Sequence, residues 1–196
     1  MFWIAWLLLI FEIYRIKLIG AIIQIRRAST EDAQHIALLG RITFTETFSE
    51  YFRDQKDLFE YYERTFDVSK IRASLQKENS LYWIAFWNEL PVGYAKLKTH
   101  SNTESIKTEN ASQLQKIYVL REFLDQKIGK QLMNELMNSF MTSDKTHLWL
   151  SVLKSNERAV QFYDRNGFKH TGEHEFRIGK EVFDFYILSF KKKKKS

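Results

Sequence analysis

The segment LQKIYVLREFLDQKIGKQLMNELM, residues 114–137, contains a helix start that could bind a phosphate. Its first residues have the pattern of a strand and its last residues that of a helix, and Arg121–Lys127 between them holds neither glycine nor proline. The first turn of a helix leaves up to four backbone N–H groups without intrahelical partners and carries a partial positive charge. A helix that opens on Ile128-Gly129-Lys130 directly after a strand therefore suits a phosphate group, although an ordinary strand-to-helix connection has the same features.

A second pair of residues with a suggestive spacing, Asn156 and Tyr163, lies in the segment SVLKSNERAVQFYDRNGF, residues 151–168. The two are seven positions apart, which is two turns of an α-helix. Their side chains would therefore point the same way, about 10 Å apart along the axis. Each residue also has an ordinary structural explanation. Asn156 suits a helix N-cap, and Tyr163 suits a half-buried core position.

Several strands and helices must bring these two segments together, and the sequence predicts them in a simple order. Alternating or apolar runs predict strands at 23–28, 81–87, 92–99, 113–119 and 147–153, and a final hairpin at 168–190 that turns at Gly179-Lys180. Helical patterns predict helices from a Ser29 or Thr30 cap to Ser49, over 54–77, from Ile128 onward and over 156–166. The order βααβββαβαββ is typical of an α/β sandwich, with helices on both faces of a mixed, mostly antiparallel sheet.

The composition narrows the class of protein. A chain of 196 residues with 15% aromatic residues is long enough for one domain with a substantial core. It has no cysteine, which excludes disulfides, cysteine nucleophiles and thiolate zinc sites and fits a reducing compartment. Of the net charge of +6, five charges belong to Lys191–Lys195. The rest of the chain therefore lacks the basic face that a nucleic-acid-binding protein needs.

Both ends of the chain differ from the predicted domain, which spans 23–190. Residues 1–22 begin with eleven apolar residues, fewer than the roughly 20 of a spanning helix, and lack the positive charge that precedes the apolar run of a signal peptide. They predict an interfacial helix that contacts a membrane surface, a loosely packed extension, or an over-long start of the reading frame. Residues 191–196 form a lysine tail that is expected to be solvated and could assist binding to anionic lipid.

A strand, a helix start, a second strand and then a helix with Asn156 and Tyr163 before Gly167-Phe168 form a combination that resembles the GCN5-related N-acetyltransferase (GNAT) superfamily, over roughly 24–190. In that family the loop before the third helix holds the pyrophosphate of acetyl-CoA with the pattern Gln/Arg-x-x-Gly-x-Gly/Ala. The pattern falls on 124–129 here, where only Gly129 is kept and Leu124 and Lys127 depart from it. The wording IYVLREF…KIGKQL, TFTETFSEYF and PVGYAKL further resembles the polyamine-acetylating branch related to PaiA.

The resemblance implies an enzyme that transfers an acetyl group from acetyl-CoA to a primary amine, on a sheet whose two middle strands splay apart. Pantetheine would pair with the backbone of 115–119, and an N–H near Val119 would stabilise the developing oxyanion. Tyr163 matches the family's general acid, which protonates the leaving thiolate, and Asn156 matches a position near the pantetheine arm. The implied cofactor-binding residues are Ile117, Tyr118, Val119, Asp125, Gln126, Lys127, Ile128, Gly129, Lys130 and Asn156, and no metal is implied.

The general base and the acceptor are less well marked. The family's strand carboxylate falls on Gln115, which cannot usefully accept a proton, so no base is assigned and Glu46 is the remaining candidate. Residues 43–67 carry seven acidic and three basic side chains, a net −4 that would attract a cationic amine such as a polyamine. Glu46 and Glu50 are the candidate substrate-binding residues. A solvated helix face explains the same charges equally well.

Three alternatives remain beside this interpretation. The segment HTGEH, 170–174, matches a His-x-x-Glu-His metal pattern, but in a hairpin strand its histidines would lie about 13 Å apart, too far for one metal ion. The eroded phosphate pattern and the missing base also fit a catalytically silent binding module of the same fold. An amino-acid or protein N-acetyltransferase is the third alternative. For an active enzyme we expect a small-molecule amine as partner, no nucleic acid, and a cytoplasmic location with membrane contact only through 1–22, and we leave a homodimer open.

Overall fold

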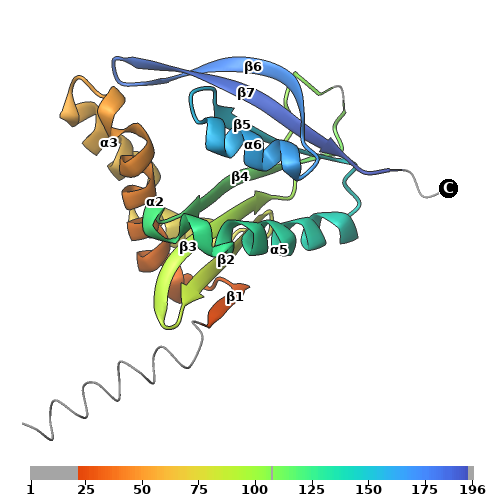
Figure 1. The fold of residues 1–196 in the computed structure, drawn as a ribbon, viewed down its shortest axis with the longest axis horizontal. Helices are drawn as coiled ribbons and strands as arrows, with labels where there is room; N and C mark the ends of the chain where they lie inside the picture. The colour runs from red at the N-terminus through yellow and green to blue at the C-terminus, as the bar shows by residue number, and fades with distance from the viewer. Residues whose placement is uncertain (1–21, 107, 194–196) are drawn as a thin grey trace, which may run out of the picture.

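The computed structural model describes residues 22–106 and 108–193, which form one seven-stranded sheet with helices on both faces (Figure 1). The prediction for 1–22 therefore lies almost wholly outside the described residues. Across the sheet the strands follow the order β1-β2-β3-β4-β5-β7-β6. The strands are β1 (Ile23–Arg27), β2 (Ser80–Trp87), β3 (Leu90–Lys98), β4 (Ala111–Val119), β5 (His147–Leu153), β6 (Lys169–Ile178) and β7 (Glu181–Lys191). The helices are α2 (Ala33–Phe48), α3 (Gln55–Thr65), α4 (Val68–Leu75), α5 (Ile128–Thr142) and α6 (Glu157–Arg165), with short 3-10 helices η1 (Thr30–Asp32), η2 (Ser49–Tyr51) and η3 (Arg121–Gln126).

Two hydrophobic layers sandwich the sheet. On one face, α5 and α6 cover a core to which α5 contributes a fully buried stripe at helical spacing, as its sequence predicts; the stripe is Ile128, Leu132, Met133, Leu136 and Phe140. On the other face, α2, α3 and α4 pack through a cluster rich in aromatic side chains that includes Phe44, Tyr61 and Phe66. The predicted α/β sandwich with a mixed, mostly antiparallel sheet is confirmed (Figure 1). Among the described residues, no helix combines the length and the apolar character that crossing a membrane requires.

The middle strands β4 and β5 diverge, as predicted. They are parallel, whereas the other neighbouring strands of the sheet are antiparallel. Their register contains only three pairs, Ala111↔His147, Ser112↔Leu148 and Gln113↔Trp149. Beyond these pairs β4 continues to Val119 and β5 to Leu153, and the two strands no longer pair. We call this region, 114–119 of β4 and 150–153 of β5, the splay.

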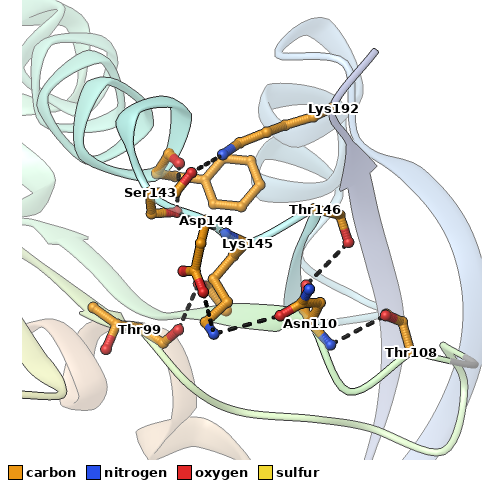
Figure 2. A network of polar contacts seen from close by, with 10 residues as sticks. Thr99, Thr108, Asn110, Ser143, Asp144, Lys145, Thr146 and Lys192 are labelled. Atoms are coloured by element: carbon orange, nitrogen blue, oxygen red, sulfur yellow. Dashed lines mark hydrogen bonds and ion pairs between the residues drawn. The ribbon is translucent and has the colours of Figure 1, made fainter. Parts of the chain in front are cut away.

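A network of polar contacts holds the closed end of the splay together (Figure 2). The Asn110 carbonyl, just before β4, accepts hydrogen bonds from the N–H groups of Thr146 and His147, at the start of β5, over 3.0 and 3.2 Å. Lys145 Nζ lies 3.1 Å from the Asp144 carboxylate and 3.5 Å from Asn110 Oδ1. These contacts fix the first residues of the two strands next to each other.

The end of β7 joins the same corner. Lys192 Nζ donates to the Ser143 carbonyl at the end of α5 over 2.8 Å and lies 4.5 Å from the centre of the Phe140 ring (Figure 2). Lys191 is the last residue of β7. The first two lysines of the run 191–195 therefore belong to the fold rather than to a solvated tail.

Three local predictions need correction. The single helix expected over 54–77 is broken at Phe66-Asp67, because Phe66 turns into the core and Asp67 caps a new helix by accepting from the N–H groups of Ser69 and Lys70. The helix expected from Ser29 begins as η1, where Ser29 and Asp32 form a capping box, and α2 starts only at Ala33. The connection over 121–127, expected as an ordinary link between a strand and a helix, is mostly a helix itself, the 3-10 helix η3.

Candidate active site

The start of α5 presents unpaired backbone N–H groups. Lys127 precedes the helix in a left-handed conformation (φ 59°, ψ 13°) and its side chain makes no capping hydrogen bond. The N–H of Gln131 is the first to find a helical carbonyl, that of Lys127, over 3.2 Å. The N–H groups of Ile128, Gly129 and Lys130 come before it and have no preceding helical carbonyl to bind. The first turn of α5 contains no acidic side chain that would repel an anion.

The left-handed Lys127 also explains the shape of the eroded phosphate pattern. The first glycine of that pattern falls on Lys127, and a positive φ is a conformation that glycine adopts at little cost. The lysine keeps the same backbone geometry at a cost of about 1–2 kcal/mol. Gly129, which is kept, has no close neighbour in the protein, since a Cβ there would meet only Val119 Cγ2 at 3.9 Å. Neither position therefore blocks an approach to the helix start.

The unpaired edge of β4 directs backbone groups into the splay. The N–H of Leu120 donates to the Val92 carbonyl of β3 over 2.9 Å. Successive N–H groups of a strand point to opposite edges, so those of Val119 and Ile117 point away from β3 and toward β5. The N–H of Tyr118 points to β3 instead, and its ring packs on the α2 face at 5.5 Å from the ring of Tyr94. Of the three predicted β4 residues, Ile117 and Val119 thus offer N–H groups to the splay.

Tyr163 belongs to α6 and lies next to the splay, on the face of the sheet opposite to the Tyr118 ring. It is 7% exposed and packs edge-on against Phe162 and Phe168, with ring centres 5.4 and 5.8 Å away. Burial raises the pKa of Tyr163 well above its ordinary value, and the neighbouring Tyr118 adds to the increase. The phenol therefore stays protonated at neutral pH, as a proton donor must. Burial and Tyr118 account for this pKa, and no hydrogen bond from another described residue contributes to it.

Asn156 is the N-cap of α6, as its ordinary explanation predicts. Its Oδ1 accepts from the Ala159 N–H over 3.1 Å, and its own N–H donates to the Leu153 carbonyl at the end of β5 over 3.0 Å. The cap leaves the side-chain NH₂ group of Asn156 as a donor next to the end of the splay. The same helix is tied to η3, because Arg158 forms a 2.9 Å ion pair with Asp125. Asp125 and Gln126 are both exposed at the end of η3.

Most acidic side chains of 43–67 already have partners. Six of the seven do: Glu46 accepts from the Arg121 N–H, Asp54 pairs with Lys180, Asp57 accepts from the Lys180 N–H, Glu60 pairs with Lys56, Glu63 with Arg41, and Asp67 caps α4. Glu50 is exposed and has no partner among the described residues. Only Lys180 and Arg41 bring opposing charge from outside this stretch, because Glu46, Asp57 and Asp67 are bound by backbone N–H groups and Lys56 is already counted in the net −4. The stretch therefore keeps a net negative charge although most of its carboxylates have partners. Glu46 lies on α2 and accepts from the N–H of Arg121, the first residue of η3 and the second residue after Val119.

The two histidines of HTGEH lie on opposite faces of the sheet. His170 packs edge-on against Tyr186, while His174 stacks on Phe185 with ring centres 5.4 Å apart. Because Tyr186 and Phe185 are consecutive in β7, these contacts are on different faces. The pair does not form a common metal site, and within 22–106 and 108–193 no three His, Asp or Glu side chains gather as ligands would. His174 has a partner that could not be predicted from the sequence: its Nε2 lies 2.9 Å from the Ser151 hydroxyl of β5.

Comparison with known proteins agrees with this arrangement. The model of the acetyltransferase (GNAT) family matches residues 42–168, which is more than half of the chain. The chain belongs to the GNAT family of acetyltransferases. The resemblance noted in the sequence is thereby confirmed, and the helix start, the splay and Tyr163 are parts of an N-acetyltransferase fold.

The relatives of this acetyltransferase include one with a named substrate. This chain is 25% identical over 166 residues to an uncharacterized N-acetyltransferase in the pepI 3′ region of Lactobacillus delbrueckii subsp. lactis, and the match covers 85% of this chain and 95% of the relative. It is 25% identical over 150 residues to the spermidine N(1)-acetyltransferase of Thermoplasma acidophilum, covering 75% and 88%. The crystal structure of the PaiA N-acetyltransferase of T. acidophilum in complex with coenzyme A has the same fold, with a TM-score of 0.71, 21% identity and coverage of 87% and 99%.

Proposed function

We propose that this acetyltransferase transfers the acetyl group of acetyl-CoA to a primary amine of the polyamine class. The observation that carries the proposal is that three groups converge on the short stretch 117–119. The start of α5 lies against it, since the space beside Gly129 ends on Val119. The N–H groups of Ile117 and Val119 point into the splay, and Tyr163 lies close enough to Tyr118 for Tyr118 to add to the burial that raises the pKa of the Tyr163 phenol.

The start of α5, the edge of β4 and Asn156 would bind the donor. The N–H groups of 128–130 would hold the pyrophosphate, with the ammonium group of Lys127 adding a charge-assisted contact. The edge of β4 would pair with the pantetheine arm, and the side-chain NH₂ of Asn156 would donate to it. Acetyl-CoA itself supplies a thioester whose carbonyl carbon an amine can attack.

The remaining groups act during the reaction. The Val119 N–H is oriented to donate to the carbonyl oxygen as negative charge develops on it. The Tyr163 hydroxyl would donate its proton to the departing sulfur, and burial, which raises the pKa of this phenol, keeps it protonated at neutral pH. Tyr163 is therefore the general acid of the proposal.

The polyamine acceptor is supported by the similarity to the spermidine N(1)-acetyltransferase of T. acidophilum, which this chain matches over 88% of that protein's length. Glu50 on η2, which is exposed and has no partner among the described residues, is the carboxylate that could attract a cationic amine. A second acceptor class, an amino acid or a protein N-terminus, is favoured by a different observation. Six of the seven acidic residues that would attract a polycation are engaged within the fold.

Two measurements test the proposal. Calorimetry should show that the protein binds acetyl-CoA, and a screen of amines with a free-thiol readout should show release of coenzyme A with spermidine above amino acids and peptides. A protein that binds acetyl-CoA but releases no thiol with any amine would be a silent binding module. Preference for peptides would move the acceptor to the second class. The cytoplasmic location, contact with membranes through 1–22 and a homodimer stay predictions.

A further inference from the structure

Ser151 occupies a position on β5 that the donor-binding groups do not use. It is the second residue after Trp149, the last residue of β5 that pairs with β4, so it lies within the splay. Side chains of a strand alternate, and Trp149, Ser151 and Leu153 share the face that α2 and α3 cover. Leu153 belongs to the aromatic cluster on that face. The Ser151 hydroxyl therefore faces the side of the sheet opposite to Tyr163 and α6.

His174 reaches Ser151 from two strands away. The strands are ordered β5-β7-β6, so β5 and β6 lie about 9.6 Å apart across β7. Ser151 lies opposite Ile187 and His174 opposite Phe185, two residues away along β7. The imidazole crosses this distance by lying flat on the Phe185 ring, with an angle of 18° between the planes. Its Nε2 comes to 2.9 Å from Ser151 Oγ. The Phe185 ring therefore supports the imidazole of His174 in the position in which it contacts Ser151.

The second nitrogen of His174 fixes which nitrogen is basic. Nδ1 lies 3.2 Å from the carbonyl oxygen of Glu175. A carbonyl oxygen can only accept, so Nδ1 carries the proton in this contact. Nε2 is then the unprotonated nitrogen, and it accepts the hydrogen bond from the Ser151 hydroxyl. The hydroxyl is half-buried and the imidazole is exposed, so a proton that arrives through Ser151 can leave to water from His174.

The charged neighbours of this pair do not neutralise it. On the opposite face of β6, Glu173 is bound by Lys154 over 2.5 Å and by His170 over 3.5 Å. Glu175 is next in the chain and lies across from Asp184 of β7. On the face of the sheet that His174 shares, the titratable groups include Lys116 of β4, over the rings of Phe66 and Tyr118, Tyr118 itself, and Tyr61 and Tyr62 of α3. Among the described residues, none of these groups forms an ion pair with His174.

We propose that Ser151 and His174 accept the proton of the acceptor amine, a step that rests on the proposed function and supplies the general base that it lacks. An ammonium group must lose a proton before its nitrogen can attack a thioester. Ser151 takes that proton as it passes its own to His174 Nε2, and the neutral amine attacks the carbonyl carbon. The C–S bond then breaks and the sulfur takes a proton from Tyr163. After the attack the nitrogen loses a second proton, which returns through solvent to the Tyr163 phenolate. His174 releases the first proton to water, so one proton is freed per turnover.

A pH profile separates this role from a structural one. We would measure kcat/KM between about pH 6 and about pH 10 with spermidine, or with the best amine of the screen if spermidine is not turned over. Variants His174→Gln and Ser151→Ala should each lower kcat/KM about 10²-fold near neutral pH. The deficit should shrink as pH rises, because an amine that is already neutral needs no base. The double variant should be no worse than either single variant, since the two residues act as one unit.

The matched control is His170→Gln, four residues away on the opposite face of the same strand, which should follow the wild-type profile throughout. A deficit in His174→Gln that is equal at every pH, or full activity in this variant, would overturn the inference. Imidazole NMR gives a readout without turnover. Acetyl-CoA should shift the ring resonances of His174 and leave those of His170 in place, and saturation with acetyl-CoA without any shift at His174 would also overturn it. If the wild type fails to bind acetyl-CoA, the proposed function is wrong, and the inference that rests on it is wrong too. This binding measurement on the wild type comes before any variant is made, so the two failures are distinguishable.

Discussion

Replacing Tyr163 by phenylalanine should stop the chemistry while leaving the fold and the donor affinity in place. The ring contacts with Phe162 and Phe168 are kept, and no hydrogen bond from a described residue contributes to the pKa of the hydroxyl that is removed. The free energy of unfolding should therefore change by less than about 1 kcal/mol. General acid catalysis contributes about 10²–10⁴-fold, so kcat should fall by that factor, which corresponds to about 2.7–5.4 kcal/mol in the activation barrier. Protonating a leaving thiolate helps mainly in the transition state, so the Kd of acetyl-CoA should stay within experimental error.

The assay compares Tyr163→Phe with Tyr82→Phe. Tyr82 lies on β2, and its hydroxyl donates to Ser74 Oγ of α4 over 2.8 Å. This hydrogen bond is in the layer that contains α4 and is away from the splay. Its loss should lower the free energy of unfolding by about 1 kcal/mol and leave kcat unchanged, which is the reverse of the Tyr163 pattern. Thiol release gives kcat, calorimetry gives the affinity for acetyl-CoA, and urea unfolding gives stability. A folded Tyr163→Phe enzyme with full kcat would refute the reasoning, and an unfolded one would assign Tyr163 to the core.

Four further outcomes follow from the same geometry. Gly129→Val should fold and should lower the affinity for acetyl-CoA at least about tenfold by calorimetry, because the valine side chain would lie where the phosphate approaches. The control Gly129→Ala should have a small effect. Equal affinities for the wild type and Gly129→Val would place the phosphate elsewhere. Lys127→Gly should raise the free energy of unfolding by up to about 1 kcal/mol in urea, because it relieves the left-handed lysine. Reversing charge at Glu46 and Glu50 together should raise the KM for spermidine, and the difference should shrink with added salt; a KM that does not move removes the electrostatic argument. Burial, and after it the charge of nearby lysines, lowers the pKa of Lys96 to about 7. Between about pH 7 and about pH 10.4 the Lys96 side chain therefore holds a proton in the unfolded chain but not in the folded chain, so the free energy of unfolding rises with pH in this range. Lys96→Met should therefore be more stable than wild type by about 1–2 kcal/mol at neutral pH, an advantage that fades toward pH 10, and an advantage independent of pH would contradict this.

The elements with a strong local pattern were predictable from the sequence. The buried stripe of α5 repeats at helical spacing, and the glycines that end α6 and turn the last hairpin have the positive φ values, 86° at Gly167 and 55° at Gly179, that mark such positions. The break before α4 was missed although Asp67 is a good N-cap. The helical pattern continues on both sides of it, and the burial of Phe66 that forces the break is a tertiary effect.

The site was predictable to the extent that the chain itself brings its parts together. Tyr163 and Asn156 share one helix, and the phosphate turn follows directly on β4. The contacts that sequence reasoning missed join distant segments. Asp54 finds Lys180 126 residues away, so the charge of 43–67 could not be judged from that stretch alone. Ser151 and His174 are 23 residues apart and are brought together only by the order of strands in the sheet.

The corner that holds β4 and β5 together acts mechanically as the pivot of two lever arms. From Gln113, the last paired residue of β4, to Val119 the strand extends six residues, about 20 Å. A tilt of about 5° at the pivot moves the far end by about 1.7 Å over such a length. Displacements of about 1 Å in reacting groups can lower a rate about 10²-fold. The hydrogen bonds of Asn110 and Lys192, at the opposite end of the strands from the reaction, thus set the distance between the two arms at which an amine and a thioester must meet.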